Sequence, residues 1–132
     1  MSALVVDASV LVAAVTEGPV AEWAVSQLAR SEALLAPHLV IAEAANVLRR
    51  ARAAKELSSA AAAAAHSSLM DLELTLFGYA PFADRIWELT TNLSAYDAWY
   101  VAVAEAVEAP LATLDQRLTR ASGPRCSFRL PG

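Results

Sequence analysis

Five short segments of mostly apolar residues are spaced along the chain, and we expect each to form a strand: residues 4–6, 33–36, 74–77, 111–114 and 126–130. They do not alternate regularly between apolar and polar positions. Strands of this kind are typical of a parallel sheet that is covered on both faces.

The segments between these strands carry apolar residues at helical spacing. The expected helices span residues 8–19, 20–30, 38–56, 58–74, 82–92, 94–108 and 116–121. The two long ones in the middle of the chain follow each other directly and predict a protruding helical hairpin. Strands that alternate with helices indicate an α/β fold, with a short, mostly parallel sheet of four or five strands and helices on both faces.

Composition narrows the class of protein. A length of 132 residues fits one domain. Hydrophobic residues make up 57% of the chain, but 31 of them are alanines, which favour helices and do not indicate a membrane span. The apolar N-terminus lacks a basic region and contains Asp7, so we expect no signal peptide. Because Cys126 is the single cysteine, no internal disulfide can form, and we expect a cytoplasmic protein.

The net charge limits how the protein could bind nucleic acid. Ten Lys and Arg residues stand against fourteen Asp and Glu residues, which gives a formal charge of −4. A protein of this charge does not coat nucleic acid by bulk attraction. Any contact with nucleic acid must therefore be local or aided by bound cations.

Acidic residues follow two of the predicted strands, Asp7 after the first and Asp115 after the fourth. Ligands of open α/β sheets bind outside the carboxyl ends of the strands. Helix capping explains either residue about as well, because Asp accepts hydrogen bonds from the first N–H groups of a helix. Asp97 is open to the same two interpretations, since Ser94 precedes it by three residues in a capping pattern.

Glu43 lies among apolar residues in the first half of a predicted helix, where an unpaired buried carboxylate would be costly. Arg50 lies on the same helix face, together with Asn46, and could form an ion pair with it. Alternatively, Glu43 joins the three aspartates in one site. Four converging carboxylates repel one another and raise each other's pKa values, a cost that a divalent cation removes.

A site built only from oxygen ligands favours Mg²⁺ or Mn²⁺ over zinc. Such a cation suits phosphodiester hydrolysis, because it polarises the phosphoryl oxygen, activates water and stabilises the leaving oxygen. Ser9 and Thr113 each lie two residues from one of the acids, so their hydroxyls could orient a water or a phosphate there. Local hydrogen bonding at a helix start or a strand end explains them equally well.

Four segments of the chain resemble those of the PIN-domain ribonucleases and, within that family, the VapC toxins of bacterial VapBC toxin–antitoxin pairs. In chain order they are LVVDASVLV, APHLVIAEAANVLRR, RIWELTTNLSAYDAWYVAVAE and APLATLDQRLTRA. The resemblance spans nearly the whole chain and implies a single PIN domain over residues 1–132. It implies an acidic quartet that binds Mg²⁺, with Mn²⁺ able to substitute, and two accessory polar residues: Asp7, Glu43, Asp97 and Asp115, with Ser9 and Thr113.

The resemblance also implies an activity and partners. Proteins of this kind are metal-dependent endoribonucleases that cut structured RNA, often tRNA or rRNA, and so arrest translation. They form homodimers and are inhibited by a VapB antitoxin in a hetero-oligomer that contacts DNA through the antitoxin. Some PIN domains carry a further acid shortly after the last one, whereas Gln116 and Arg117 follow Asp115 here. The sequence therefore does not decide between one bound metal ion and two.

Several other residues have two interpretations. Asn46 and Arg50 could contact RNA or an antitoxin, or could simply be solvated. Five aromatic residues could belong to a dimer or antitoxin surface, but their helical spacing favours core packing: Trp23, Trp87, Tyr96, Trp99 and Tyr100. Neither histidine lies in a catalytic or metal-binding motif.

Three competing functions remain: a PIN-like binding module without turnover, a nuclease that acts on DNA or flaps, and a phosphoacceptor domain. The third is disfavoured because Asp7-Ala8-Ser9 lacks the second aspartate of a dehalogenase motif.

Overall fold

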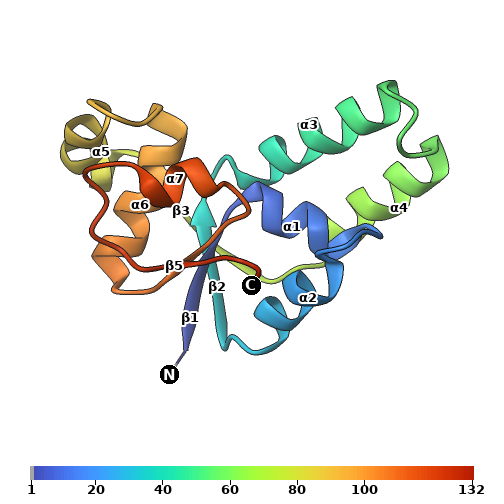
Figure 1. Cartoon of the computed structure of the whole chain (residues 1–132), viewed down its shortest axis with the longest axis horizontal. Coiled ribbons are helices and arrows are strands. Elements are labelled where there is room, and N and C mark those ends of the chain that lie inside the picture. Colours follow the sequence, from blue (N-terminus) through green and yellow to red (C-terminus); the bar gives the residue numbers. More distant parts are fainter. Residues whose placement is uncertain (1) are drawn as a thin grey trace.

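A five-stranded sheet runs through the middle of the computed structural model, which describes residues 2–132 (Figure 1). The strands lie in the order β3-β2-β1-β4-β5, and every pair of neighbours among the described residues is parallel. The sheet expected to be mostly parallel is therefore entirely so. Its strands are β1 (Ala3–Val6), β2 (Ala33–Pro37), β3 (Leu74–Phe77), β4 (Leu111–Ala112) and β5 (Phe128–Arg129).

Helices cover both faces of this sheet, as expected for an α/β fold (Figure 1). Helices α1 and α2 lie on one side of the strands, and α5 and α6 lie on the other. Helices α3 and α4 project together beyond the sheet and confirm the predicted hairpin. The bounds are α1 (Ala8–Val15), α2 (Ala21–Ala29), α3 (Val40–Ala53), α4 (Ser59–Met70), α5 (Ala83–Leu89), α6 (Ala95–Val107) and α7 (Gln116–Arg120), with a 3₁₀ turn η1 (Ala80–Phe82).

The core forms around β1, the central strand. Leu4, Val5 and Val6 are completely buried because β1 has a strand on each side and helices on both faces. On α6, the run Ala98–Ala104 is also buried, since this helix lies between the sheet and α5. Alanines along α6 allow its backbone to approach the sheet closely.

Helix ends depart from the predicted bounds for local reasons. The helix expected over 58–74 ends at Met70, which leaves room for β3 to begin at Leu74. Helix α3 ends at Ala53, and Lys55 adopts a left-handed conformation, with φ at 61°, as the chain turns into α4. Glu108, with φ at 55°, caps α6 in the same conformation, so α6 ends before Pro110 is reached.

Two strands are shorter than the sequence pattern indicates. β4 ends at Ala112, so that Thr113 and Leu114 lie outside the sheet, and β5 contains only Phe128–Arg129 of the expected segment 126–130. The hydroxyl of Thr113, the residue after β4, donates to the carboxylate of Asp7. Among residues 2–132, none of the helices has the length and apolar character needed to cross a membrane.

Candidate active site

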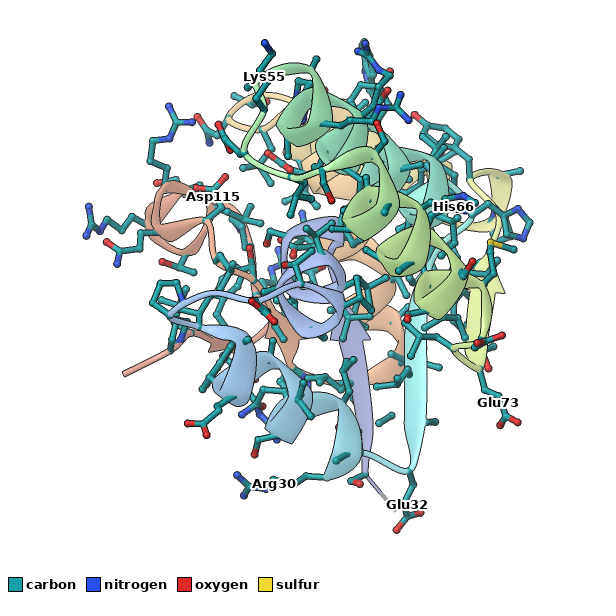
Figure 2. The ribbon with its side chains drawn as sticks, turned by 90° about the vertical axis from the view of Figure 1, so that its right-hand side faces the viewer. Arg30, Glu32, Lys55, His66, Glu73 and Asp115 are labelled. Carbon is teal, nitrogen blue, oxygen red and sulfur yellow. The ribbon has the colours of Figure 1, made fainter. Side chains whose placement is uncertain are left out.

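The candidate site lies at the carboxyl edge of the parallel sheet. Asp7 directly follows β1, and Asp115 follows the neighbouring strand β4 by three residues. Because the carboxyl ends of parallel strands meet at one edge, these two residues share that edge. Figure 2 shows Asp115 where the chain enters α7.

Asp7 is held by hydrogen bonds on both of its carboxylate oxygens. Ser9 donates its hydroxyl to Oδ1 over 2.5 Å, and the amide of Val10 donates to the same oxygen over 3.1 Å. Thr113 donates its hydroxyl to Oδ2. Asp7 is therefore the N-cap of α1, as the capping interpretation expects, and it also has one oxygen that faces β4.

Ser9 and Thr113 tie the two aspartate loops together. The amide of Leu114 donates to Ser9 Oγ over 3.1 Å, and the amide of Asp115 donates to Thr113 Oγ1 over 3.0 Å. Thr113 is completely buried. Each hydroxyl thus accepts a hydrogen bond from the loop after β4 and donates one to the carboxylate after β1. Ser9 and Thr113 therefore make local hydrogen bonds at a helix start and a strand end, and they also lie beside the acids.

Glu43 lies in the first turn of α3 and is paired with Tyr100 of α6. The Tyr100 hydroxyl donates to Glu43 Oε1 over 2.6 Å. The alternative ion pair with Arg50 is absent, because the ion pairs of residues 2–132 all involve Arg85. Sequence reasoning placed Tyr100 in the core, where it is, but missed this contact. The available signal was its position three residues after Asp97, on the same face of one helix.

Asp97 and Asp115 combine capping with a place at the site. The amide of Asp97 donates to Ser94 Oγ over 3.1 Å, which confirms the capping pattern at the start of α6. Asp115 Oδ1 accepts the amides of Arg117 and Leu118 over 2.9 and 3.3 Å and so caps α7. Both side chains are half-buried. Capping at a helix start and clustering with other acids are therefore compatible here.

The electrostatics show that the four carboxylates are neighbours. Burial raises the pKa of Glu43, and the charges of Asp97 and Asp7 raise it further, against the hydrogen bond from Tyr100. Burial also raises the pKa of Asp97, and the charges of Asp115 and Asp7 add to this. The pKa of Asp7 is raised by burial in spite of the hydrogen bonds from Ser9 and Thr113. Each acid thus interacts with at least one of the others.

The donor set fits a hard divalent cation, because it offers only carboxylate and hydroxyl oxygens. Asp7, Glu43 and Asp115, however, are each oriented by their own hydrogen-bond donors. Across residues 2–132, no three Asp, Glu, His or Cys side chains already surround a common point. Asp7 is bonded to two hydroxyls, Glu43 to Tyr100 and Asp115 to the amides of α7. A cation bound here would offset the negative charge of the carboxylates and so favour the charged forms of Asp7, Glu43 and Asp97, whose pKa values are raised.

Asn46 and Arg50 lie further along α3 from Glu43 and are exposed. Both line one cavity together with Glu43. The histidines lie outside the site: His38 and His66 are exposed, and His66 points outward from α4 (Figure 2). Core packing is confirmed for Trp99 and Tyr100 but is wrong for Trp87 and Tyr96, which are 75% and 58% exposed because their faces of α5 and α6 point away from the sheet.

Comparisons with known proteins agree with this geometry. Residues 4–124 match the family model of the PIN domain. The chain is 40% identical over 123 residues to the VapC ribonuclease Mb0985 of Mycobacterium bovis, which covers 93% of this chain and 94% of the relative. VapC nucleases with a PIN domain generally depend on a divalent metal.

Two solved structures share the fold. VapC20 of Mycobacterium tuberculosis, described as a toxin that cleaves the sarcin–ricin loop, superposes with a TM-score of 0.68 at 19% identity and covers 89% of this chain and 93% of its own. VapBC2 of Rickettsia felis, bound to a DNA fragment from its promoter, gives a TM-score of 0.67 at 16% identity, with coverage of 98% and 99%. The α/β fold expected from the sequence is thus confirmed as PIN-like.

Proposed function

This chain belongs to the PIN-domain family of VapC ribonucleases, and we propose that it cleaves RNA with a divalent cation held by Asp7, Glu43, Asp97 and Asp115. As a member of that family it is the toxin of a toxin–antitoxin pair and an endoribonuclease that hydrolyses phosphodiester bonds. The assignment of these four residues as ligands, and of Mg²⁺ with Mn²⁺ as its substitute, is our proposal.

The observation that carries the proposal is the proximity of the four carboxylates: the charges of Asp97 and Asp7 act on Glu43, and those of Asp115 and Asp7 act on Asp97. They come from four separate parts of the fold, after β1, on α3, on α6 and after β4. Three of them have raised pKa values, to which burial contributes most and the charges of the other acids add in two cases. A fold that gathers four acids against this cost is well suited to bind a cation.

The chain's own residues would orient the ligands. Ser9 and Thr113 fix both oxygens of Asp7, and Tyr100 fixes one oxygen of Glu43, so that the other oxygen of Glu43 stays available. A bound Mg²⁺ would supply Lewis-acid activation of water and of the phosphodiester. Asp97 and Asp115, at the starts of α6 and α7, would complete the set.

The RNA is proposed to be tRNA or rRNA, approached along the exposed side of α3. Asn46 and Arg50 offer donors for phosphate or base edges next to Glu43. A net charge of −4 makes such local contacts, together with the cation, the main attraction for a polyanion.

We further propose that the partner is a VapB-type antitoxin. The VapBC2 complex of Rickettsia felis supports this, since a protein of the same fold occurs there in a complex bound to promoter DNA. A homodimer, a hetero-oligomer with the antitoxin, DNA contact only through the antitoxin and a cytoplasmic location belong to the same proposal. Purification of the chain with the product of a neighbouring small gene, followed by mass measurement of the complex, tests it.

The decisive test is cleavage of total bacterial RNA by wild-type protein and by Asp7→Asn. Both are incubated with Mg²⁺ or Mn²⁺ and with EDTA, and new 5′ ends are mapped by sequencing. Asp71→Asn serves as the matched control, because Asp71 is exposed at the end of α4. We expect few discrete ends that require metal, persist in Asp71→Asn and vanish in Asp7→Asn.

Two results would contradict the proposal. An Asp7→Asn protein that still cuts RNA would remove Asp7 from the metal site. A folded, antitoxin-free wild-type protein that cuts no RNA would favour a binding module without turnover, or a nuclease for DNA or flaps if single-stranded or flapped DNA is cut instead.

A further inference from the structure

A cavity of about 370 Å³ opens beside the four carboxylates. Glu43, Asn46 and Arg50 line it from α3, Ala8 from the start of α1, and Tyr96 from the first turn of α6. Glu43 belongs both to this cavity and to the acidic site. Whatever occupies the cavity therefore lies directly next to the proposed cation. The volume is within the range of cavities that hold small ligands.

Tyr96 lines this cavity with an aromatic side chain that is largely exposed. Its side chain is 58% exposed, although it immediately precedes Asp97. Within residues 2–132, its ring forms none of the aromatic pairs and its hydroxyl makes no hydrogen bond. Tyr79, by contrast, is 41% exposed but packs edge-on against Trp99 with ring centres 5.4 Å apart. The face of the Tyr96 ring is thus available to a ligand.

The other side of the cavity offers hydrogen-bond donors. Asn46 Oδ1 accepts from Arg49 Nε over 3.2 Å, which leaves the amide NH₂ of Asn46 for another acceptor. Arg50 is exposed and takes part in none of the ion pairs of the described chain. A guanidinium in this position can bind a phosphate or the edge of a base. An aromatic ring in the same cavity as such donors matches the chemistry of a single nucleotide.

We propose that Tyr96 stacks on an unpaired base of the RNA next to the bond that is cut, while Arg50 and Asn46 bind its phosphate or base edge. This inference rests on the proposed function, because it places the base relative to the acidic site. A paired base hides its faces within the helix, whereas a base in a loop or single strand exposes them. The substrate class at this position is therefore single-stranded RNA, and stacking alone tolerates any base.

Binding without turnover tests this separately from cleavage. The parent protein is Asp7→Asn, which we expect to fold but not to cut RNA. Tyr96→Ala and Tyr96→Phe are each introduced into it separately. The probe is a fluorescein-labelled single-stranded oligoribonucleotide of mixed sequence, compared with the blunt duplex made from it, in Mg²⁺ and by fluorescence anisotropy. Trp87→Ala is the matched control for loss of an exposed aromatic side chain. Thermal melts establish that each variant is folded, and alanine at an exposed helical position favours this.

We expect Tyr96→Ala to raise the Kd for the single strand about 5- to 150-fold, the range that corresponds to loss of one base–aromatic stack. Tyr96→Phe and Trp87→Ala should stay within about twofold of the parent protein, since phenylalanine keeps the ring and Trp87 lies outside the cavity. The duplex should bind more weakly than the single strand, and its binding should not depend on Tyr96.

Several outcomes would overturn the inference. Unchanged RNA binding by Tyr96→Ala would show that the ring is not part of the RNA-binding site. Weak RNA binding by Tyr96→Phe would assign the effect to the hydroxyl instead of stacking. A duplex that binds as tightly and with the same dependence on Tyr96 would exclude an unpaired base. Loss of antitoxin binding with unchanged RNA binding would assign the cavity to a protein partner. Because the measurement requires no cleavage, failure of the nuclease proposal would show separately, in the wild-type RNA digest.

Discussion

The hydroxyl of Tyr100 donates a 2.6 Å hydrogen bond to Oε1 of Glu43 and so connects α6 to α3 across 57 positions of sequence. Tyr100 is only 3% exposed, while Glu43 is half-buried at the site. The bond lowers the pKa of Glu43 against the effects of burial and of its acidic neighbours. It therefore favours the charged form that a cation requires.

Replacing Tyr100 by phenylalanine should weaken cation binding more than it weakens the fold. Without the hydroxyl, the pKa of Glu43 rises further and its carboxylate loses its fixed orientation. We expect the Mg²⁺ concentration for half-maximal cleavage to increase about 10- to 100-fold, the usual effect of losing a residue that orients a ligand. Unfolding free energy should fall by only about 1 kcal/mol.

Titration of cleavage rate against Mg²⁺ at fixed pH measures this effect. Tyr79→Phe is the matched control, because the Tyr79 hydroxyl lies outside the site and its ring contact with Trp99 is retained. A Tyr100→Phe protein with unchanged Mg²⁺ dependence and a lower melting temperature would show that Tyr100 acts only in packing.

Thr113→Val should affect both stability and activity. The hydroxyl of Thr113 donates to Asp7 Oδ2 and accepts from the amide of Asp115. Valine has nearly the same shape but leaves both partners unsatisfied in a completely buried position. We expect a loss of about 1–3 kcal/mol in urea unfolding and a fall of about 10- to 100-fold in cleavage rate.

The matched control for this change is Thr119→Val, since the Thr119 hydroxyl donates only to the nearby carbonyl of Gln116 within α7. Equal effects of the two substitutions on cleavage would contradict the role of Thr113 in holding Asp7.

The stability of the metal-free protein should depend on pH through Asp7. Burial raises the pKa of Asp7 in the folded protein above its ordinary value of 3.8. Between these two values the folded state binds more protons than the unfolded state, so the unfolding free energy falls as pH rises through this window and stays lowered above it. Asp7→Asn removes this contribution.

Urea unfolding in EDTA at a series of pH values tests the sign. We expect Asp7→Asn to gain stability relative to wild type as pH rises, and Mg²⁺ to stabilise the wild type alone. Comparison between the two proteins cancels the contributions of titrating groups that do not interact with Asp7. Glu43 and Asp97 also lose the repulsion of the Asp7 charge in the variant, which changes the difference in the same direction. Parallel curves for wild type and variant would show that burial of Asp7 has no energetic cost.

Much of the fold follows from the sequence for simple reasons. Residues 4–6 and 33–36 form short apolar runs, which favour buried strands, and Ser94 caps a helix where the pattern expects it. The order of the strands does not follow, because hydrophobicity reports burial and not which strand pairs with which. The early end of β4 does not follow either, because Thr113 and Leu114 continue the run of residues that predicts the strand.

The candidate site shows the same division. Asp7 and Asp115 were predictable, since they follow parallel strands that end at one edge of the sheet. The partner of Glu43 was not: local spacing offered Arg50, seven residues away on the same helix, as one alternative, whereas the structure provides Tyr100 from another helix. The exposure of Tyr96 was not predictable from helical spacing either, because the buried part of α6 begins only at Ala98.

Glu105 provides a case in which a buried acid supports the fold and not the chemistry. It lies eight residues after Asp97 on α6, about 12 Å along the helix, and accepts hydrogen bonds from Arg85 at 2.7 and 3.1 Å and from the amide of Arg125 at 2.7 Å. Burial alone would raise the pKa of Glu105, but these partners outweigh it and lower the pKa. Its contribution to stability is therefore present above the ordinary carboxyl pKa and is lost as pH falls through the lowered value.

Glu105→Gln should reduce the unfolding free energy by about 1–2 kcal/mol at pH 7, and this difference should disappear in acid, while RNA cleavage remains within about twofold of wild type. A Glu105→Gln protein of normal stability that no longer cuts RNA would contradict this purely structural role and would extend the functional region to this end of α6.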